Sequence, residues 1–179
     1  CATCDAAFFR GLKVCVVGDS PEALKEAEVL SPFAGSLLLV TPSGTPQLPE
    51  GLSKAQTMSH SRVVSIEGTE FVTGIMVKNK KTGLEQNMPM DGVFIYLYGA
   101  MPSVDFIDPA VVLGDKSCVM THQMTETSLA GVYAAGDVTC SEVRQVVVSA
   151  ACGCVAALAA EKYLRQRKTG RHDWAKAEN

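Results

Sequence analysis

Apolar residues in the first part of the chain form short runs that turn-forming residues separate. Residues 13–17 are such a run and predict a buried strand, and residues 36–40 predict a second one. Between them, a capping residue and Pro21 precede residues 22–30, which we expect to be helical. A strand, a helix and a second strand in this order predict a parallel sheet.

The middle of the chain has a different pattern, in which apolar and polar positions alternate. Residues 62–67 and 71–79 alternate as antiparallel strands do, with residues 80–83 as a turn. Residues 42–51 are rich in Pro, Gly and Ser and predict a loop. The continuous apolar run at residues 90–98 predicts a central strand of the sheet.

The last third of the chain predicts one short strand and one long helix. The strand is expected at residues 131–135, and the helix from residue 143 to about residue 167. Residues 146–160 are apolar almost all round the helix. We therefore expect this helix to be buried against a sheet.

The composition is that of an ordinary soluble globular protein. The chain has 179 residues, of which 47% are hydrophobic and 20% charged, and its net charge is -3. No basic stripe suggests a nucleic-acid partner. We find no apolar stretch that approaches the roughly 20 residues needed to span a bilayer, so we expect no membrane partner.

The cysteine content favours a reducing compartment, and we expect a cytoplasmic protein. Seven cysteines are an odd number, and their spacing is not that of a disulfide framework. Small buried hydrophobes or loop thiols are the interpretation for five of them: Cys15, Cys118, Cys140, Cys152 and Cys154.

The remaining two cysteines form a Cys-x-x-Cys pair at the start of the chain. Cys1 and Cys4 are followed at once by Asp5, whose carboxylate could supply or remove a proton during thiol–disulfide exchange. A zinc site would need two further ligands at comparable spacing, and no second Cys-x-x-Cys is present. Redox chemistry is therefore the leading hypothesis, and no metal is expected. Because a catalytic pair at a chain end would be poorly held, we expect the sequence to be the back portion of a longer polypeptide.

Several segments along nearly the whole chain together resemble one family. They are residues 1–5 and 8–10, residues 131–138, Arg144-Gln145, Ser149-Ala150, Ala156-Ala157 and residues 161–164. In order and spacing these segments resemble the low-molecular-weight thioredoxin reductases: the first two their redox segment, the next three their second flavin-binding motif, and the last two their closing helix.

The resemblance implies an α/β fold of the pyridine nucleotide-disulfide oxidoreductase type, with Rossmann-like, three-layer FAD/NAD(P)-binding domains. Residues 1–88 would form the pyridine-nucleotide-type domain that carries the redox pair. Residues 89–179 would be the last part of an FAD-binding domain, whose first part, with the glycine-rich loop for the ADP moiety, is absent from this sequence. The family likeness also implies a homodimer.

The resemblance also implies roles for single residues. Cys1 would attack the disulfide of a protein partner, Cys4 would exchange electrons with the flavin, and Asp5 would be the acid–base group. A hydroxyl of the flavin side chain could donate to Asp137, and a helix beginning near residue 144 would direct its N–H groups toward the flavin ring. For Gly136 and Asp137 a simple capped turn is the alternative. The residues assigned to FAD are Gly136, Asp137, Arg144, Gln145 and Val146.

The expected NADPH loop departs from the family pattern. The family has Gly-x-Gly-x-x-Ala, whereas residues 18–23 place Ser20 at the second glycine and add the acids Asp19 and Glu22. No Lys, Arg or His lies between Lys25 and Lys54 to neutralise a 2′-phosphate. NADPH is therefore a doubtful cofactor, and the pattern is similar to that of ferredoxin-dependent flavin thioredoxin reductases.

The leading prediction is a thioredoxin-reductase-like flavoprotein, an enzyme that passes electrons through FAD and the Cys1–Cys4 pair to a thioredoxin-type protein. Ferredoxin is the candidate donor. Three alternatives stay open: a flavin-dependent dithiol oxidase that uses oxygen, an NADPH-dependent reductase with a divergent loop, and a non-catalytic scaffold. The direction of electron flow does not follow from the sequence, because exchange between a dithiol and a flavin is reversible.

Overall fold

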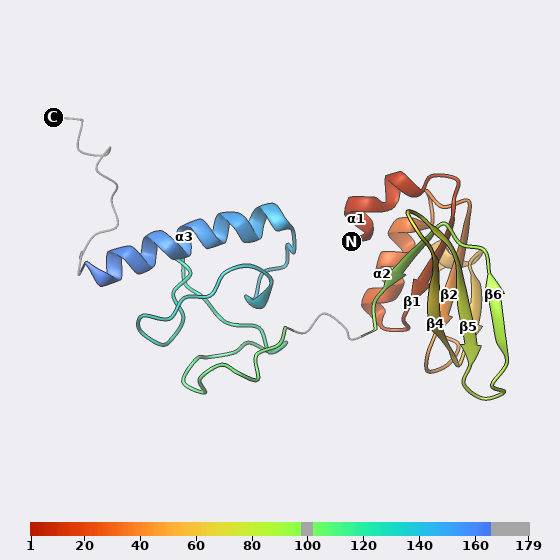
Figure 1. The fold of residues 1–179 in the computed structure, drawn as a ribbon. Coiled ribbons are helices and arrows are strands. Elements are labelled where there is room, and N and C mark those ends of the chain that lie inside the picture. The colour runs from red at the N-terminus through yellow and green to blue at the C-terminus, as the bar shows by residue number, and fades with distance from the viewer. Residues whose placement is uncertain (98–101, 166–179) are drawn as a thin grey trace. The chain divides into compact units, whose positions relative to one another are not determined.

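The computed structural model describes residues 1–97 and 102–165 and divides the chain into two compact units, Cys1–Ala100 and Met101–Asn179 (Figure 1). The division falls after residue 100 and not at residue 88, because the strand Gly92–Ile95 pairs with the first strand of the chain. The assignment of residues 1–88 and 89–179 to two cofactor domains stays a prediction.

The first unit is built on a parallel sheet with the order β3-β2-β1-β7. Its strands are β1 (Lys13–Val17), β2 (Ser36–Thr41), β3 (Gln56–Ser59) and β7 (Gly92–Ile95). Its strand pairings, β1 with β2, β1 with β7 and β2 with β3, are parallel, and Cys15 lies opposite Leu38 on one side and opposite Val93 on the other. The expected strand–helix–strand unit with parallel strands is confirmed.

Three helical segments accompany this sheet: α1 (Ala2–Asp5) with the 3₁₀ turn η1 (Ala6–Phe9), α2 (Pro21–Leu30) and the 3₁₀ turn η2 (Glu50–Leu52). The start of α2 follows from its sequence. Ser20 accepts a hydrogen bond from the Ala23 N–H at 3.1 Å, and Pro21 occupies the first turn, where a missing N–H costs nothing.

A second, antiparallel sheet has the order β4-β5-β6. It covers the face of the parallel sheet opposite to the one on which α1 and α2 pack (Figure 1). Its strands are β4 (Ser61–Gly68), β5 (Val72–Asn79) and β6 (Glu85–Met88). The expected antiparallel pair is thus confirmed, with β6 as an additional strand.

The core of the first unit lies on both faces of the parallel sheet. On one face, Val14, Val16 and Leu39 pack with buried residues of α1 and α2. On the other, Cys15 and Val40 pack with buried residues of β5. Successive residues of a strand point to opposite faces, so a continuous apolar run is what a sheet covered on both sides requires. This gives the three layers that were expected.

The expectation of a central strand at residues 90–98 was wrong. Among the described strands, β7 is at the edge of its sheet, and Ile95 is 56% exposed. An apolar run shows that a strand is partly covered but does not show which strands flank it. Residue 98 lies outside the described residues.

The second unit contains little regular structure in its described part. It has the 3₁₀ turn η3 (Gly136–Val138) and the helix α3 (Val146–Leu164). The strand expected at residues 131–135 did not form, and an isolated bridge joins Glu126 to Tyr133 instead. The helix is shorter than expected at its N-terminal end, and residues 166 and 167 lie outside the described part.

Two expectations about α3 were wrong: that it is buried against a sheet, and that no apolar stretch is long enough to span a bilayer. All residues of α3 are described, and of these Ala159 is the buried one, whereas Val146 is 86% exposed. Within residues 1–97 and 102–165, α3 is the one helix whose length and apolar composition would allow it to cross a membrane. A single such helix is weak evidence for a membrane span, because core helices of soluble proteins have the same composition.

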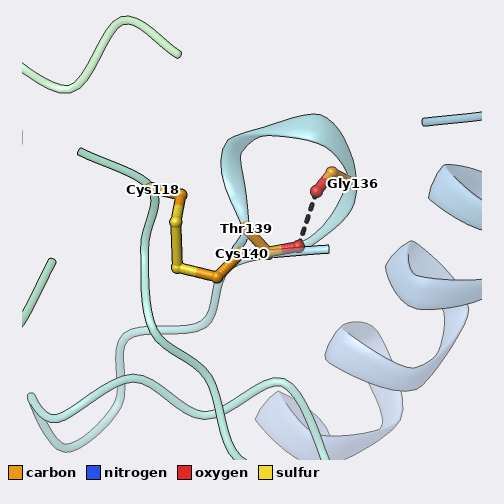
Figure 2. Close-up of a disulfide and its surroundings, with 4 residues drawn as sticks. All are labelled: Cys118, Gly136, Thr139 and Cys140. Atoms are coloured by element: carbon orange, nitrogen blue, oxygen red, sulfur yellow. Dashed lines mark hydrogen bonds between the residues drawn. A yellow bond between two sulfur atoms is a disulfide. The ribbon is translucent and has the colours of Figure 1, made fainter. Parts of the chain in front are cut away.

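The interpretation of Cys118 and Cys140 as separate thiols was also wrong, because these residues form a disulfide (Figure 2). Their Cα atoms lie 4.9 Å apart, within the usual range for a disulfide. The pairing joins positions 22 residues apart, and neither position belongs to a recognisable spacing pattern.

Replacing Leu39 by alanine should lower the free energy of unfolding by about 2–5 kcal/mol, because Leu39 is fully buried in the parallel sheet. The matched control is Leu12→Ala, at a leucine that is 39% exposed, which should cost much less. Urea unfolding of the two variants gives the comparison. Equal losses would contradict the placement of the core.

Candidate active site

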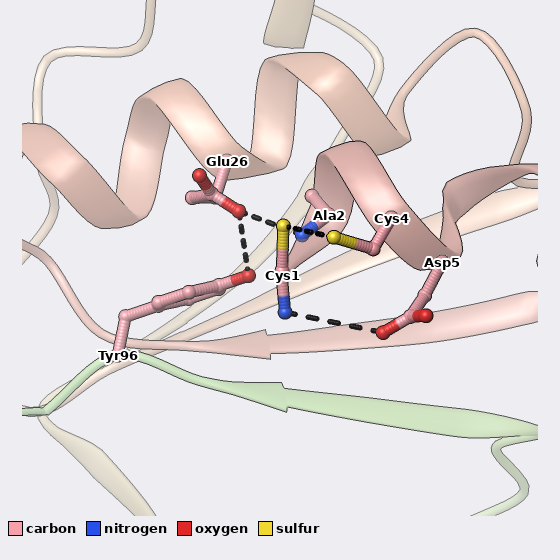
Figure 3. A network of polar contacts seen from close by, with 6 residues as sticks. All are labelled: Cys1, Ala2, Cys4, Asp5, Glu26 and Tyr96. Carbon is pink, nitrogen blue, oxygen red and sulfur yellow. Dashed lines mark hydrogen bonds and ion pairs between the residues drawn. The ribbon is translucent and has the colours of Figure 1, made fainter. Parts of the chain in front are cut away.

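The two sulfurs of the Cys-x-x-Cys pair lie together at the surface of the first unit (Figure 3). Cys1 is the N-cap of α1 and Cys4 lies within it, so the residues share one helical face. The Cys4 thiol donates to the Cys1 sulfur at 2.8 Å. A reduced dithiol in this arrangement can close to a disulfide with a small movement, since an S–S bond is about 2.05 Å long.

The helix that carries the pair is held to α2 by a partly buried carboxylate contact. The Ala2 N–H donates to the Glu26 carboxylate at 2.7 Å, and the side chain of Ala2 is fully buried. Ala6, which is 3% exposed, adds a second apolar contact on the same side. The position of the two sulfurs therefore depends on α2 as well as on their own short helix.

The same carboxylate oxygen of Glu26 also accepts a hydrogen bond from the Tyr96 hydroxyl at 2.9 Å. Burial, and then the hydrogen bond to Glu26, raise the pKa of Tyr96. The phenol therefore stays protonated and remains a donor to Glu26 across the neutral range. Figure 3 shows the tyrosine and the glutamate on the side of Cys1 away from Asp5.

Glu26 and Tyr96 were not predicted from the sequence, although one signal was present. Ala23, Ala27 and Leu30 are the buried positions of α2, and Glu26 lies three residues after Ala23 and four before Leu30, at helical spacing from both. A carboxylate on the buried face of a helix needs a partner. The identity of that partner did not follow, because Tyr96 is 70 residues away in the chain.

Asp5 is the last residue of α1, the helix that carries the redox pair. Its carboxylate is 3.9 Å from the backbone nitrogen of Cys1. The acid–base role of Asp5 stays a prediction.

The residues assigned to a flavin come together in the second unit at the start of α3. Gly136 has a φ of 80°, and a Cβ atom there would lie 3.1 Å from the Ser149 Oγ, so glycine allows a close approach to the helix. The Ser149 hydroxyl donates to Asp137 at 3.2 Å. Asp137 therefore lies beside the first turn of α3.

The other assigned residues are at the N-terminus of the same helix. Gln145 is the N-cap of α3, Arg144 precedes it, and Val146 begins the helix. The first N–H groups of an α-helix have no partner within the helix. An exposed carboxylate, a helix N-terminus and an exposed apolar residue fit a ligand with hydroxyl groups and a flat ring that carries negative charge when reduced, as FAD has. The individual contacts stay predictions.

The loop expected to bind NADPH makes contacts within the protein. The Asp19 carboxylate accepts a hydrogen bond from the Ser43 N–H at 2.8 Å, which joins the loop after β1 to the loop after β2. The Ser20 hydroxyl is the acceptor that caps α2. These carboxyl ends of neighbouring parallel strands are where a dinucleotide binds in folds of this type.

Nearly the whole chain is similar in sequence to known proteins. No family model matches the chain. It is 39% identical over 175 residues to thioredoxin reductase of Aquifex aeolicus, covering 94% of this chain and 54% of that protein. It is 33% identical to the bifunctional thioredoxin reductase/thioredoxin of Mycobacterium leprae, covering 93% and 38%.

Solved structures give the same result. A thioredoxin reductase from Streptococcus pyogenes matches with a TM-score of 0.76 at 28% identity, covering 93% of this chain and 56% of that one. One from Gloeobacter violaceus matches with a TM-score of 0.56 at 37% identity, covering 97% and 56%. The FAD/NAD(P)-binding fold implied by the resemblance is therefore confirmed.

The three-layer unit with a surface dithiol thus belongs to a protein of the FAD/NAD(P)-binding fold class. Over nearly its whole length the chain is homologous to the C-terminal portion of proteins of the thioredoxin reductase family. It spans about half the length of the relatives that it matches, or less.

Glu26→Ala should lower the free energy of unfolding by about 1–3 kcal/mol, because the buried Ala2 N–H and the Tyr96 hydroxyl both lose their acceptor. Cys1 and Cys4 should also react faster with iodoacetamide, because α1 is held less firmly. The control is Glu28→Ala on the same helix, which makes no contact with α1 that we observe and should change stability by less than about 0.5 kcal/mol. Equal effects of the two variants would contradict the anchoring role of Glu26.

Cys15 should resist alkylation at pH 8, because it is fully buried and burial raises the pKa of its thiol to about 12. In the unfolded chain the thiol ionises near its ordinary pKa of 9.0. The resulting contribution to stability is complete below pH 9 and is lost as the pH rises toward 12. The free energy of unfolding should therefore fall more steeply over this range in the parent than in Cys15→Ala. Parallel slopes for the two proteins would contradict the buried thiol.

Proposed function

We propose that the protein is a thioredoxin-reductase-like flavoprotein, in which FAD and the Cys1–Cys4 pair pass electrons to a thioredoxin-type protein. The observation that carries the proposal is the reduced pair, with its sulfurs 2.8 Å apart on an anchored surface helix. The names of the homologous proteins support the same chemistry. A homodimer in the cytoplasm is part of the proposal.

The chain's own residues supply the exchange steps. The Cys1 thiolate attacks one sulfur of the partner's disulfide, and the partner's other sulfur leaves as a thiolate that takes up a proton. Cys4, deprotonated, then attacks the Cys1 sulfur, which closes the Cys1–Cys4 disulfide and releases the partner as a dithiol. Two electrons and two protons reach the partner. Asp5 is the group beside the pair that can hold one of these protons.

FAD, when bound, supplies the two-electron exchange that returns the Cys1–Cys4 disulfide to the dithiol. Gly136, Asp137, Arg144, Gln145 and Val146 are the residues of this chain that would contact it. Cys4 is the sulfur assigned to this exchange, since Cys1 is assigned to the partner.

NADPH is not the electron donor in this proposal. A dinucleotide phosphate needs N–H groups and positive charge at the loop after β1, whereas Pro21 has no N–H and Ser20 already accepts from α2. The Asp19 carboxylate accepts a hydrogen bond from the Ser43 N–H and places negative charge between the loop after β1 and the loop after β2. Charge-assisted hydrogen bonds contribute about 1.5–3 kcal/mol each, so losing two lowers affinity by about two to four powers of ten. A ferredoxin-type carrier is the proposed donor.

The test uses the full-length polypeptide with its flavin, kept free of oxygen. Reduced ferredoxin should bleach the flavin band and support reduction of a thioredoxin disulfide, and a stoichiometric amount of NADPH should do neither. Bleaching by NADPH would overturn the assignment of the donor. Production of hydrogen peroxide from a small dithiol, without reduction of thioredoxin, would instead indicate a dithiol oxidase.

Cys4→Ser should lower the rate of thioredoxin reduction by on the order of a thousandfold or more, because the resolving thiol is lost. The matched control is Cys154→Ser, at an exposed cysteine of α3, which should leave the rate unchanged. A Cys4→Ser rate equal to that of the parent would contradict the role of Cys4, and a parent protein that reduces no thioredoxin would favour the scaffold alternative over the enzyme.

A further inference from the structure

The Cys118–Cys140 disulfide lies in the second unit, next to the residues assigned to the flavin. Cys140 follows the turn of η3, in which the Thr139 N–H and hydroxyl both donate to the Gly136 carbonyl (Figure 2). The Val119 N–H donates to the Val138 carbonyl, and the Cys140 N–H donates to the Val119 carbonyl. The disulfide thus reinforces a short parallel contact between two segments.

The two halves of this disulfide differ in their access to solvent. Cys118 is 7% exposed, whereas Cys140 is an exposed residue. Gly114 packs directly against the sulfurs, since a Cβ atom there would lie 2.9 Å from the Cys140 sulfur and 3.3 Å from the Cys118 sulfur. Gly114 therefore covers one side of the bond, and Cys140 is the more exposed of the two residues.

We propose that Cys118–Cys140 is a second thiol–disulfide exchange site, distinct from Cys1–Cys4. Its substrate class is a protein dithiol of the Cys-x-x-Cys type, which attacks the sulfur of Cys140, the more exposed residue of the pair. The state of the bond controls how firmly the Gly136–Cys140 turn is held. This inference does not depend on the electron donor or on the direction of flow at Cys1–Cys4.

The exchange balances in two steps. A thiolate of the incoming dithiol bonds to the Cys140 sulfur, the bond between Cys140 and Cys118 breaks, and the Cys118 thiolate takes up a proton. The second thiol of the incoming protein, deprotonated, then bonds to its partner sulfur and releases the Cys140 thiolate, which is also protonated. The incoming dithiol is oxidised to a disulfide, and Cys118 and Cys140 gain the two electrons.

Reduction acts on the turn because the bond closes a loop that contains it. Residues 119–139 lie between the two cysteines and include Gly136 and Asp137. Opening a covalent loop lets its segments separate more often, and only the backbone hydrogen bonds around Val119 then hold them together. Because Asp137 accepts from Ser149 of α3, this loosening reaches the contact between the turn and the helix.

The first measurement counts thiols in the full-length protein under native conditions. A reduced thioredoxin is added, unreacted thiols are alkylated, and the peptides containing Cys118 and Cys140 are analysed by mass spectrometry. In a Cys1→Ser/Cys4→Ser background, which removes the first exchange site, both peptides should be unlabelled before reduction and labelled after it. Labelling before thioredoxin is added would show that the bond is absent. No labelling after thioredoxin is added would show an inert structural crosslink. Either result would overturn the proposal.

The second measurement tests the effect on the turn. With the bond reduced and alkylated, limited proteolysis between residues 119 and 139 should be on the order of tenfold faster, because cleavage follows the fraction of open chain. The double variant Cys118→Ala/Cys140→Ala should be cleaved as fast as the parent with its disulfide reduced, whether or not thioredoxin is added. Cys152→Ser should behave as the parent. If reduction leaves cleavage unchanged, the control of the turn is refuted.

Discussion

The docking of α1 on α2 is the contact on which the proposed chemistry depends. A four-residue helix has almost no stability of its own, because forming its first turn costs more than its hydrogen bonds return. Here it is held by burial of Ala2 and Ala6 and by the bond from the Ala2 N–H to Glu26. The two sulfurs, which are 2.8 Å apart, owe their position to these contacts and not to the Cys-x-x-Cys pattern alone.

Local patterns were enough to predict much of the fold. The strands at residues 13–17 and 36–40 are apolar on both faces, and the helix between them has its capping serine and first-turn proline, so each segment has one favourable structure. Three of the four residues of β3 (Gln56–Ser59) are polar and carry no such pattern, and β3 was missed. The edge position of β7 was missed because strand order depends on tertiary pairing, which a local pattern does not contain.

For the candidate site, too, residues that are neighbours in the sequence could be predicted, whereas contacts between distant positions could not. Cys1, Cys4 and Asp5 are neighbours in the sequence, and the structure keeps them together on α1. The partner of Glu26 and the pairing of Cys118 with Cys140 both join distant positions, and no spacing rule relates them. The departure of residues 18–23 from the NADPH-loop pattern could be read from the sequence, whereas the hydrogen bond from the Ser43 N–H to Asp19 needed the folded chain.

The register of the parallel sheet has a consequence for synthesis of the protein. Strand β1 lies between β2 and β7, and Val17 pairs with both Val40 and Ile95. At translation rates of about 5–20 residues per second, the 78 residues from Val17 to Ile95 take about 4–16 s to emerge. During that interval one edge of β1 is unpaired on the nascent chain. The ribosome and its chaperones therefore handle an apolar strand with an open edge before the first unit can close.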